Sequence, residues 1–230
     1  MNKKINVKEY LDPNIPSEEM KEIRLKMIGK HSYQKQQAKE DLDGLIYNNF
    51  LFNSHQMDEI KEGIELGLDV SNYSDPRFDW EQMDEIKEGL QDKLDVSKYN
   101  DPIFDKYQMY EIKEGLQDKL DVSSYSDPKY DYKQMIQIRL GLYSDFDPSI
   151  YTDPKYDSHQ MDEIRRGLLY GIDVSSYADP KYNDKQMEQI RLGLEDFVDT
   201  SIYTDPKYNS YQMSEIRKGL SYNSNIKNDK

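Results

Sequence analysis

Residues 69–94 decide the fold of this chain, and they read DVSNYSDPRFDWEQMDEIKEGLQDKL. The same pattern returns every 26 residues, and a Gln-Met pair marks it most regularly. The methionines of these pairs are Met57, Met83, Met109, Met135, Met161, Met187 and Met213. A divergent eighth copy leads the chain around Met20. Self-similarity at a fixed period of this length is the signature of a repeat protein.

The apolar residues of each copy predict one main helix. Isoleucine stands three residues after each methionine and Leu or Ile seven after it, as in Met83, Ile86 and Leu90. This spacing places the three side chains on one helical face. An Asp or Asn four residues before the methionine, with the Gln that follows it, forms a capping box, so the helix should begin there. We expect it to end nine or ten residues after the methionine, where Gly67 and Gly171 fit a left-handed cap.

The rest of each copy predicts a short helical turn and an extended return. Asp-Val-Ser-x-Tyr begins a single turn that its Asp can cap, and the following Asp-Pro pair forces extended backbone. Because one copy cannot bury its own apolar side chains, we expect an all-α fold, a short α-solenoid of eight stacked units. The methionine and tyrosine columns should pack in its core. The glycine six residues after each methionine implies close approach of a neighbouring helix or return strand.

Three segments follow from this pattern. Residues 1–50 hold the divergent first copy with an inserted polar cap segment, and residues 51–220 hold the regular repeats. Residues 221–230 show no pattern, so we expect a disordered tail.

Charge and composition narrow the function classes. The net charge is −14, and the acidity is concentrated in residues 51–126, with eight Lys and Arg against nineteen Asp and Glu. Such a surface repels phosphate backbones, which disfavours direct nucleic-acid binding and favours a basic protein partner. The absence of cysteine excludes disulfides and thiolate metal sites. No apolar stretch has the length of a signal peptide or membrane span, so we expect a cytoplasmic protein that does not enter membranes.

The distribution of reactive residues predicts a protein that is not an enzyme and needs no cofactor. Catalysis requires asymmetry, whereas the distinctive residue types here recur at the same place in each copy. The histidines are His31, His55 and His159, and the last two occupy the same repeat position four copies apart, so they cannot converge. Ser-His-Asp and phosphate-loop patterns are absent.

The repeated aspartates raise calcium as an alternative. Asp69, Asp75 and Asp79 supply hard oxygen ligands in each copy, but their spacing does not match an EF-hand loop. Helix caps and turns account for all three without a metal.

Positions at which the copies differ are the candidates for partner binding, because the scaffold does not dictate them. One set lies one and five residues after the methionines, and a second lies at the helix N-termini, where aromatic residues are typical interface anchors. The predicted partner-binding residues are Asp58, Glu62, Trp80, Glu81, Asp84, Glu88, Tyr107, Tyr110, Glu111, Glu114 and Tyr132. Stacking should align the N-terminal set along one edge. Later copies become partly apolar, at Ile136, Leu140 and Leu192.

The unit DVSxYxDPxYxxxQMxEIRxGL resembles tandem repeats in proteins of unknown function from Firmicutes bacteria, their phages and their conjugative elements. Nearly the whole chain carries it. The resemblance implies an interaction segment, and a freestanding acidic array is similar to something a mobile element makes to engage a host protein. A phage-encoded chain would act in the host cytoplasm.

Two functions are therefore expected. The first is a non-enzymatic repeat scaffold that binds a protein partner through its variable surface. The alternative is an acidic phage or mobile-element inhibitor, an anti-CRISPR-like decoy that blocks a nucleic-acid-binding host defence protein. Its phosphate stand-ins would be Asp58, Glu62, Asp84, Glu88, Glu111 and Glu114. Salt distinguishes the two, since charges are screened beyond about 10 Å at 0.1 M salt whereas aromatic contacts persist.

Overall fold

The computed structural model describes residues 52–228, and side chains as far as residue 222. This part of the chain is all-α, with the main helices α3 (Ser54–Leu66), α4 (Trp80–Gln91), α5 (Lys106–Gln117), α6 (Tyr132–Tyr143), α7 (Ser158–Leu169), α8 (Asp184–Glu195) and α9 (Ser210–Asn228). A one-turn 3-10 helix follows each of them except α9; these are η2 (Val70–Asn72), η3 (Val96–Lys98), η4 (Val122–Ser124), η5 (Pro148–Ile150), η6 (Val174–Ser176) and η7 (Thr200–Ile202). The predicted alternation of a main helix and a short helical turn is confirmed.

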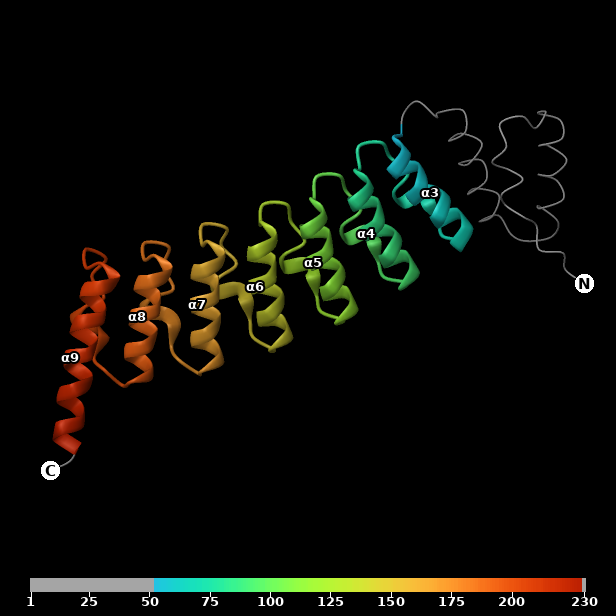
Figure 1. Ribbon diagram of the computed structural model, residues 1–230. Coiled ribbons are helices and arrows are strands. Elements are labelled where there is room, and N and C mark those ends of the chain that lie inside the picture. Colours follow the sequence, from blue (N-terminus) through green and yellow to red (C-terminus); the bar gives the residue numbers. More distant parts are fainter. Residues whose placement is uncertain (1–51, 229–230) are drawn as a thin grey trace, which may run out of the picture. The chain divides into compact units, whose positions relative to one another are not determined.

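The described residues fall into two compact units, divided between Pro102 and Ile103. In the first unit, α3 packs against α4. In the second unit, α5 to α9 lie side by side, and each contacts the next in the series (Figure 1). Packing in series is the arrangement predicted for an α-solenoid, and each unit shows it. The divergent first copy and its inserted segment lie outside the described residues.

Capping boxes begin the helices, as predicted. At α5, the Asp105 carboxylate accepts a hydrogen bond from the Gln108 backbone N–H at 2.9 Å, and the Gln108 side-chain oxygen accepts from the Asp105 N–H at 2.8 Å. The Gln108 amide nitrogen also donates to the carbonyl oxygens of Pro128 and Tyr130 in the next return segment, at 3.5 and 2.6 Å. One buried glutamine thus caps its own helix and holds the following repeat.

A left-handed residue ends the helix in six repeats, ten residues after the methionine. Gly67 and Gly171 occupy this position with φ of 76° and 69°, as predicted. The other four repeats place a side chain there, although the left-handed region favours glycine. These residues are Lys93, Lys119, Asp145 and Phe197, with φ between 57° and 60°.

The core consists of the methionine, isoleucine and tyrosine columns, and the described tyrosines of the column are fully buried; they are Tyr73, Tyr99, Tyr125, Tyr151, Tyr177 and Tyr203. The Tyr177 hydroxyl donates to the Glu163 carbonyl oxygen at 3.2 Å. The same hydroxyl lies 1.9 Å from where a Cβ on Gly167 would stand. The expectation that a neighbouring helix or return strand approaches this glycine is wrong, because the tyrosine of the same repeat fills the space.

The C-terminal end differs from the expected disordered tail. Helix α9 continues past Leu220 to Asn228. Residues 221–228 contain no glycine or proline, the two residues that interrupt a helix most strongly.

Candidate interaction surface

An aromatic pair lies at the N-terminal ends of the two helices described in the first unit. Trp80 is the first residue of α4, and the capping box holds the backbone there while the side chain stays 42% exposed. Its ring lies 5.8 Å from the His55 ring of α3, centroid to centroid. The predicted alignment of helix N-termini along one edge therefore brings the variable positions of neighbouring repeats into contact.

The second unit has an equivalent pair. The rings of Tyr107 on α5 and Tyr132 on α6 are 5.1 Å apart, and Tyr107 is 53% exposed. Lysine ammonium groups extend the cluster, with Lys106 5.0 Å from the Tyr107 ring centre and Lys133 5.9 Å from the Tyr132 ring centre. Each aromatic or cation–π contact of this kind contributes about 0.5–1 kcal/mol, which favours the paired arrangement. The result is a small aromatic surface shared by two repeats.

Lys87 neutralises part of the predicted acidic face in the first unit. Its ammonium group lies 2.5 Å from the Glu59 carboxylate, 2.6 Å from that of Glu62 and 3.1 Å from that of Asp84. Burial alone would lower the pKa of Lys87, but the hydrogen bonds to these carboxylates outweigh burial and raise that pKa. Lys87 therefore remains charged. Asp58 stays outward, with 71% of its side chain exposed, beside Lys61.

The partner-binding residues predicted in the fourth copy do not share one surface. Tyr110 is exposed and Glu114 half-buried, and the Glu114 charge raises the pKa of the Tyr110 hydroxyl. Glu111 is buried and forms an ion pair with Arg139 of α6 at 2.9 Å. Burial raises the pKa of Glu111, and the charge and hydrogen bond of Arg139 oppose that rise. Glu111 thus joins two repeats, apart from the exposed residues. In the first unit, Glu88 is exposed and Glu81 half-buried.

Sequence reasoning missed a column of polar links between repeats. In each link, a Glu or Gln two residues after one methionine meets a Lys or Arg four residues after the next, 28 residues further along the chain. The links that the structure describes within the units are Glu59–Lys87, Glu111–Arg139, Gln137–Arg165, Glu163–Arg191 and Gln189–Arg217. The sequence signal was a recurring acceptor and cation at a constant spacing of 28.

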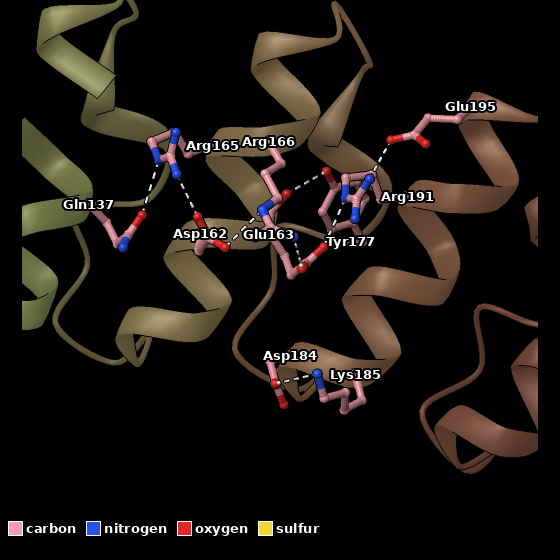
Figure 2. Close-up of polar contacts among 10 residues, drawn as sticks. All are labelled: Gln137, Asp162, Glu163, Arg165, Arg166, Tyr177, Asp184, Lys185, Arg191 and Glu195. Atoms are coloured by element: carbon pink, nitrogen blue, oxygen red, sulfur yellow. Dashed lines mark hydrogen bonds and ion pairs between the residues drawn. The ribbon is translucent and has the colours of Figure 1, made fainter. Parts of the chain in front are cut away.

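Figure 2 shows two of these links in the second unit. Arg191 of α8 donates to Glu163 of α7 at 2.8 Å and also pairs with Glu195 on its own helix. Burial by itself would lower the pKa of Arg191, but these two carboxylates raise it. Arg165 likewise joins Gln137 of α6, at 3.0 Å, to Asp162, at 2.5 Å. Cations that are largely buried therefore bond to two repeats at once.

The later copies present a different surface one and five residues after the methionine. Ile136 and Leu140 on α6 are half-buried, as is Leu192 on α8. Asp162 of α7 bonds to Arg166 at 2.9 Å, within its own helix. The apolar positions are therefore only partly exposed, and Asp162 is paired with a cation. The surface differs less between early and later copies than the sequence alone indicates.

The repeated aspartates serve backbone geometry. Asp69 accepts from the Ser71 N–H, Asp75 from the Arg77 N–H, and Asp79 from the Gln82 N–H. Within residues 52–222, no three His, Cys, Asp or Glu side chains gather so that they could hold a metal ion. The interpretation of these aspartates as caps and turns is confirmed.

Comparison with protein-family models, with curated proteins and with solved structures found no match. None of the helices α3 to α9 combines the length and the apolar character that crossing a membrane requires.

Proposed function

We propose that the chain is a non-enzymatic repeat scaffold that binds a protein partner through exposed aromatic residues at the helix N-termini. The observation that carries this proposal is the pairing of variable aromatic side chains between neighbouring repeats, His55 with Trp80 and Tyr107 with Tyr132. Trp and Tyr are enriched among the residues that dominate binding energy at protein interfaces. Rings already held in place lose little conformational freedom on binding.

The separation of constant framework positions from variable surface positions within each repeat supports the same function. Gln, Gly, Met and Tyr recur at fixed positions in every regular copy. They form the helix caps, the core and the contacts between repeats. The residues at the N-terminal edge vary from copy to copy and contribute little to that framework. Such a split is typical of repeat proteins, in which a constant scaffold displays a variable binding surface.

The acidic-inhibitor alternative has weaker support. Of its six phosphate stand-ins, Glu62 and Asp84 already contact Lys87, and Glu111 contacts Arg139. A carboxylate bonded to a neighbouring cation projects less negative potential toward a nucleic-acid-binding channel.

A pull-down with the full chain from a bacterial extract tests the proposal. Bait proteins are the parent chain, a Trp80→Ala, Tyr107→Ala double variant and a Tyr222→Ala control, each washed at low and high salt. Tyr222 is a suitable control because its side chain is 69% exposed and it lies on α9, outside the aromatic pairs. Bound proteins are identified by mass spectrometry, and the dissociation constant of each purified partner is then measured.

The scaffold predicts a partner that resists the high-salt wash and whose affinity falls at least about tenfold in the double variant, the scale expected of interface anchors. The Tyr222→Ala control should bind as the parent does. A basic nucleic-acid-binding protein released by salt and unaffected by the double variant would instead establish the acidic inhibitor. No partner in either wash would reject both functions.

A further inference from the structure

The loops after α7 and α8 line a solvent-open pocket of about 530 Å³ in the second unit. Apolar side chains line it, namely Tyr170 and Ile172 from the first loop and Leu194 and Phe197 from the end of α8 and the second loop. Asp173 and Glu195 lie at the same pocket. It belongs to the C-terminal ends of the helices, whereas the aromatic pairs described above belong to their N-terminal ends.

Phe197 is the residue of this pocket at which the left-handed end of the helix carries a large apolar side chain. Its φ of 57° is left-handed, and two other repeats place glycine at this position. A phenylalanine there costs conformational free energy that glycine would not. Burial offers no compensation, because the side chain is 95% exposed. Backbone strain of this kind persists only where the surrounding structure holds it, and at Phe197 it keeps an apolar ring in solvent.

The charges around the pocket indicate what it would accept. The two loops that line it, 169–173 and 195–199, contain four carboxylates and no lysine or arginine; these residues are Asp173, Glu195, Asp196 and Asp199. Arg191 and Arg217 from the helices compensate Glu195 and Asp196. The last carbonyl groups of α7 and α8 add partial negative charge at the same ends.

A hydrogen bond keeps the Asp173 carboxylate of the pocket ionised. Asp173 accepts the backbone N–H of Ser175, and this bond lowers the pKa of the aspartate. The exposed ring of Tyr170 lines the same pocket. Aromatic faces and carboxylates both attract lysine and arginine. The surface is therefore complementary to a cationic partner with an apolar anchor.

We propose that this pocket binds a short basic segment of a partner protein, which inserts one aromatic or aliphatic side chain between Tyr170 and Phe197 and places Lys or Arg beside Asp173. This binding does not depend on the aromatic pairs at the helix N-termini. A scaffold that also uses those pairs would then hold two segments at opposite ends of its helices.

Fluorescence anisotropy with labelled twelve-residue peptides tests the pocket in the full chain. The probe alternates arginine and serine around a central phenylalanine. One comparison peptide has serine in place of the phenylalanine, and another has glutamate in place of every arginine. The probe should bind at least about tenfold more tightly than either comparison peptide, because it alone supplies both the anchor and the charge.

The decisive variant is Phe197→Gly, which removes the ring and relieves the left-handed backbone together. It should raise the midpoint of thermal unfolding while weakening the probe at least about tenfold, an outcome that a structural role for the ring cannot produce. Lys119→Gly relieves the same backbone strain in another loop, so it should raise the midpoint and leave binding unchanged. Tyr170→Ala should also weaken the probe.

Three results would overturn the proposal: no binding of the probe, equal binding of the serine-centred peptide, or parent-like binding by Phe197→Gly. The Trp80→Ala, Tyr107→Ala variant should bind the probe as the parent does. If it loses the probe while Phe197→Gly keeps it, the peptide binds at the helix N-termini and the pocket is rejected, while the proposed scaffold function stands.

Discussion

The hydroxyl oxygen of Tyr125 lies 1.9 Å from the point at which a Cβ on Gly115 would stand. Only glycine leaves room for this oxygen, which donates to the Glu111 carbonyl of the same helix at 3.1 Å. The buried ring therefore locks the 3-10 turn of each repeat onto its own main helix. Glycine inside a helix costs about 1 kcal/mol relative to alanine, and the seated tyrosine offsets that cost.

Gly115→Ala should destabilise the protein by about 2 kcal/mol. The new methyl group displaces a ring that has no empty space to enter, and overpacking a core costs about 1–3 kcal/mol. Gly219→Ala is the matched control, because nothing lies within 4 Å of its Cβ position. We expect it to stabilise α9 by up to about 1 kcal/mol. Urea unfolding of both variants measures the two free energies, and a stabilising Gly115→Ala would contradict the lock.

Gln160→Ala should lower the free energy of unfolding by about 2–3 kcal/mol, a larger loss than that expected of Gln212→Ala. The Gln160 amide accepts from the Asp157 N–H at 2.7 Å and donates to the carbonyl oxygens of Pro180 and Tyr182, at 3.4 and 2.6 Å. Its removal leaves these buried backbone groups without hydrogen-bond partners, and each unsatisfied group costs about 1–3 kcal/mol. Gln212 caps α9 in the same way but precedes no further return segment in the described residues, so its loss should cost about 1 kcal/mol. Equal losses in urea unfolding would refute the bridging role of Gln160.

The link between Glu163 and Arg191 should show strong coupling in a double-mutant cycle. Both side chains are largely buried and lie 2.8 Å apart, so Arg191→Met alone leaves a carboxylate without its main partner and should cost about 3–5 kcal/mol. Adding Glu163→Leu should recover part of that loss, with a coupling of about 1–3 kcal/mol. The pair Glu215 and Lys218 on α9 provides the comparison, because the two side chains are 53% and 61% exposed and such pairs couple by less than about 1 kcal/mol. Similar coupling in both cycles would show that the link is an ordinary surface pair.

Alkaline pH should unfold the repeats through their buried tyrosines. Burial raises the pKa of Tyr151 and Tyr203 from the usual 10.0 to about 12, so the folded state favours the neutral hydroxyl. That stabilisation is complete below pH 10, the pKa of an unfolded tyrosine, and is lost as the pH rises toward 12. Thermal unfolding followed by circular dichroism from pH 8 to 12 measures the loss. Tyr151→Phe should flatten the alkaline decline, since one titrating group is gone, whereas Tyr222→Phe should not.

Much of the fold could be predicted because the decisive interactions are local. Asp105 and Gln108 are three residues apart, and the left-handed Gly67 follows Met57 by ten, so both appear in one copy of the repeat. The tyrosine and glycine columns could also be recognised in the sequence, but the contact between them could not be predicted. Gly115 and Tyr125 meet only because the 3-10 turn folds back along its own helix, a direction that residue spacing does not fix.

The candidate surface was predicted in part for a similar reason. The N-terminal edge followed from the repeat, because equivalent residues of stacked helices lie next to each other, as Tyr107 and Tyr132 do. Glu111 illustrates the limit. It differs from Tyr110 by one position, yet one residue turns a helix by about 100°, which takes Glu111 from the exposed side to the contact with Arg139. Deciding between them requires the orientation of the neighbouring helix.

The 28-residue links also make the second unit tolerant of recombination. Excising residues 158–183, one complete period, would bring Arg191 opposite Gln137, the acceptor that Arg165 uses now. Asp157 would take over the cap at Gln186, in the role that it already performs for Gln160. Unequal crossing-over between copies can therefore add or remove repeats without leaving a buried cation unmatched. Such an array can evolve in length as readily as in surface, because each new junction reproduces an existing one.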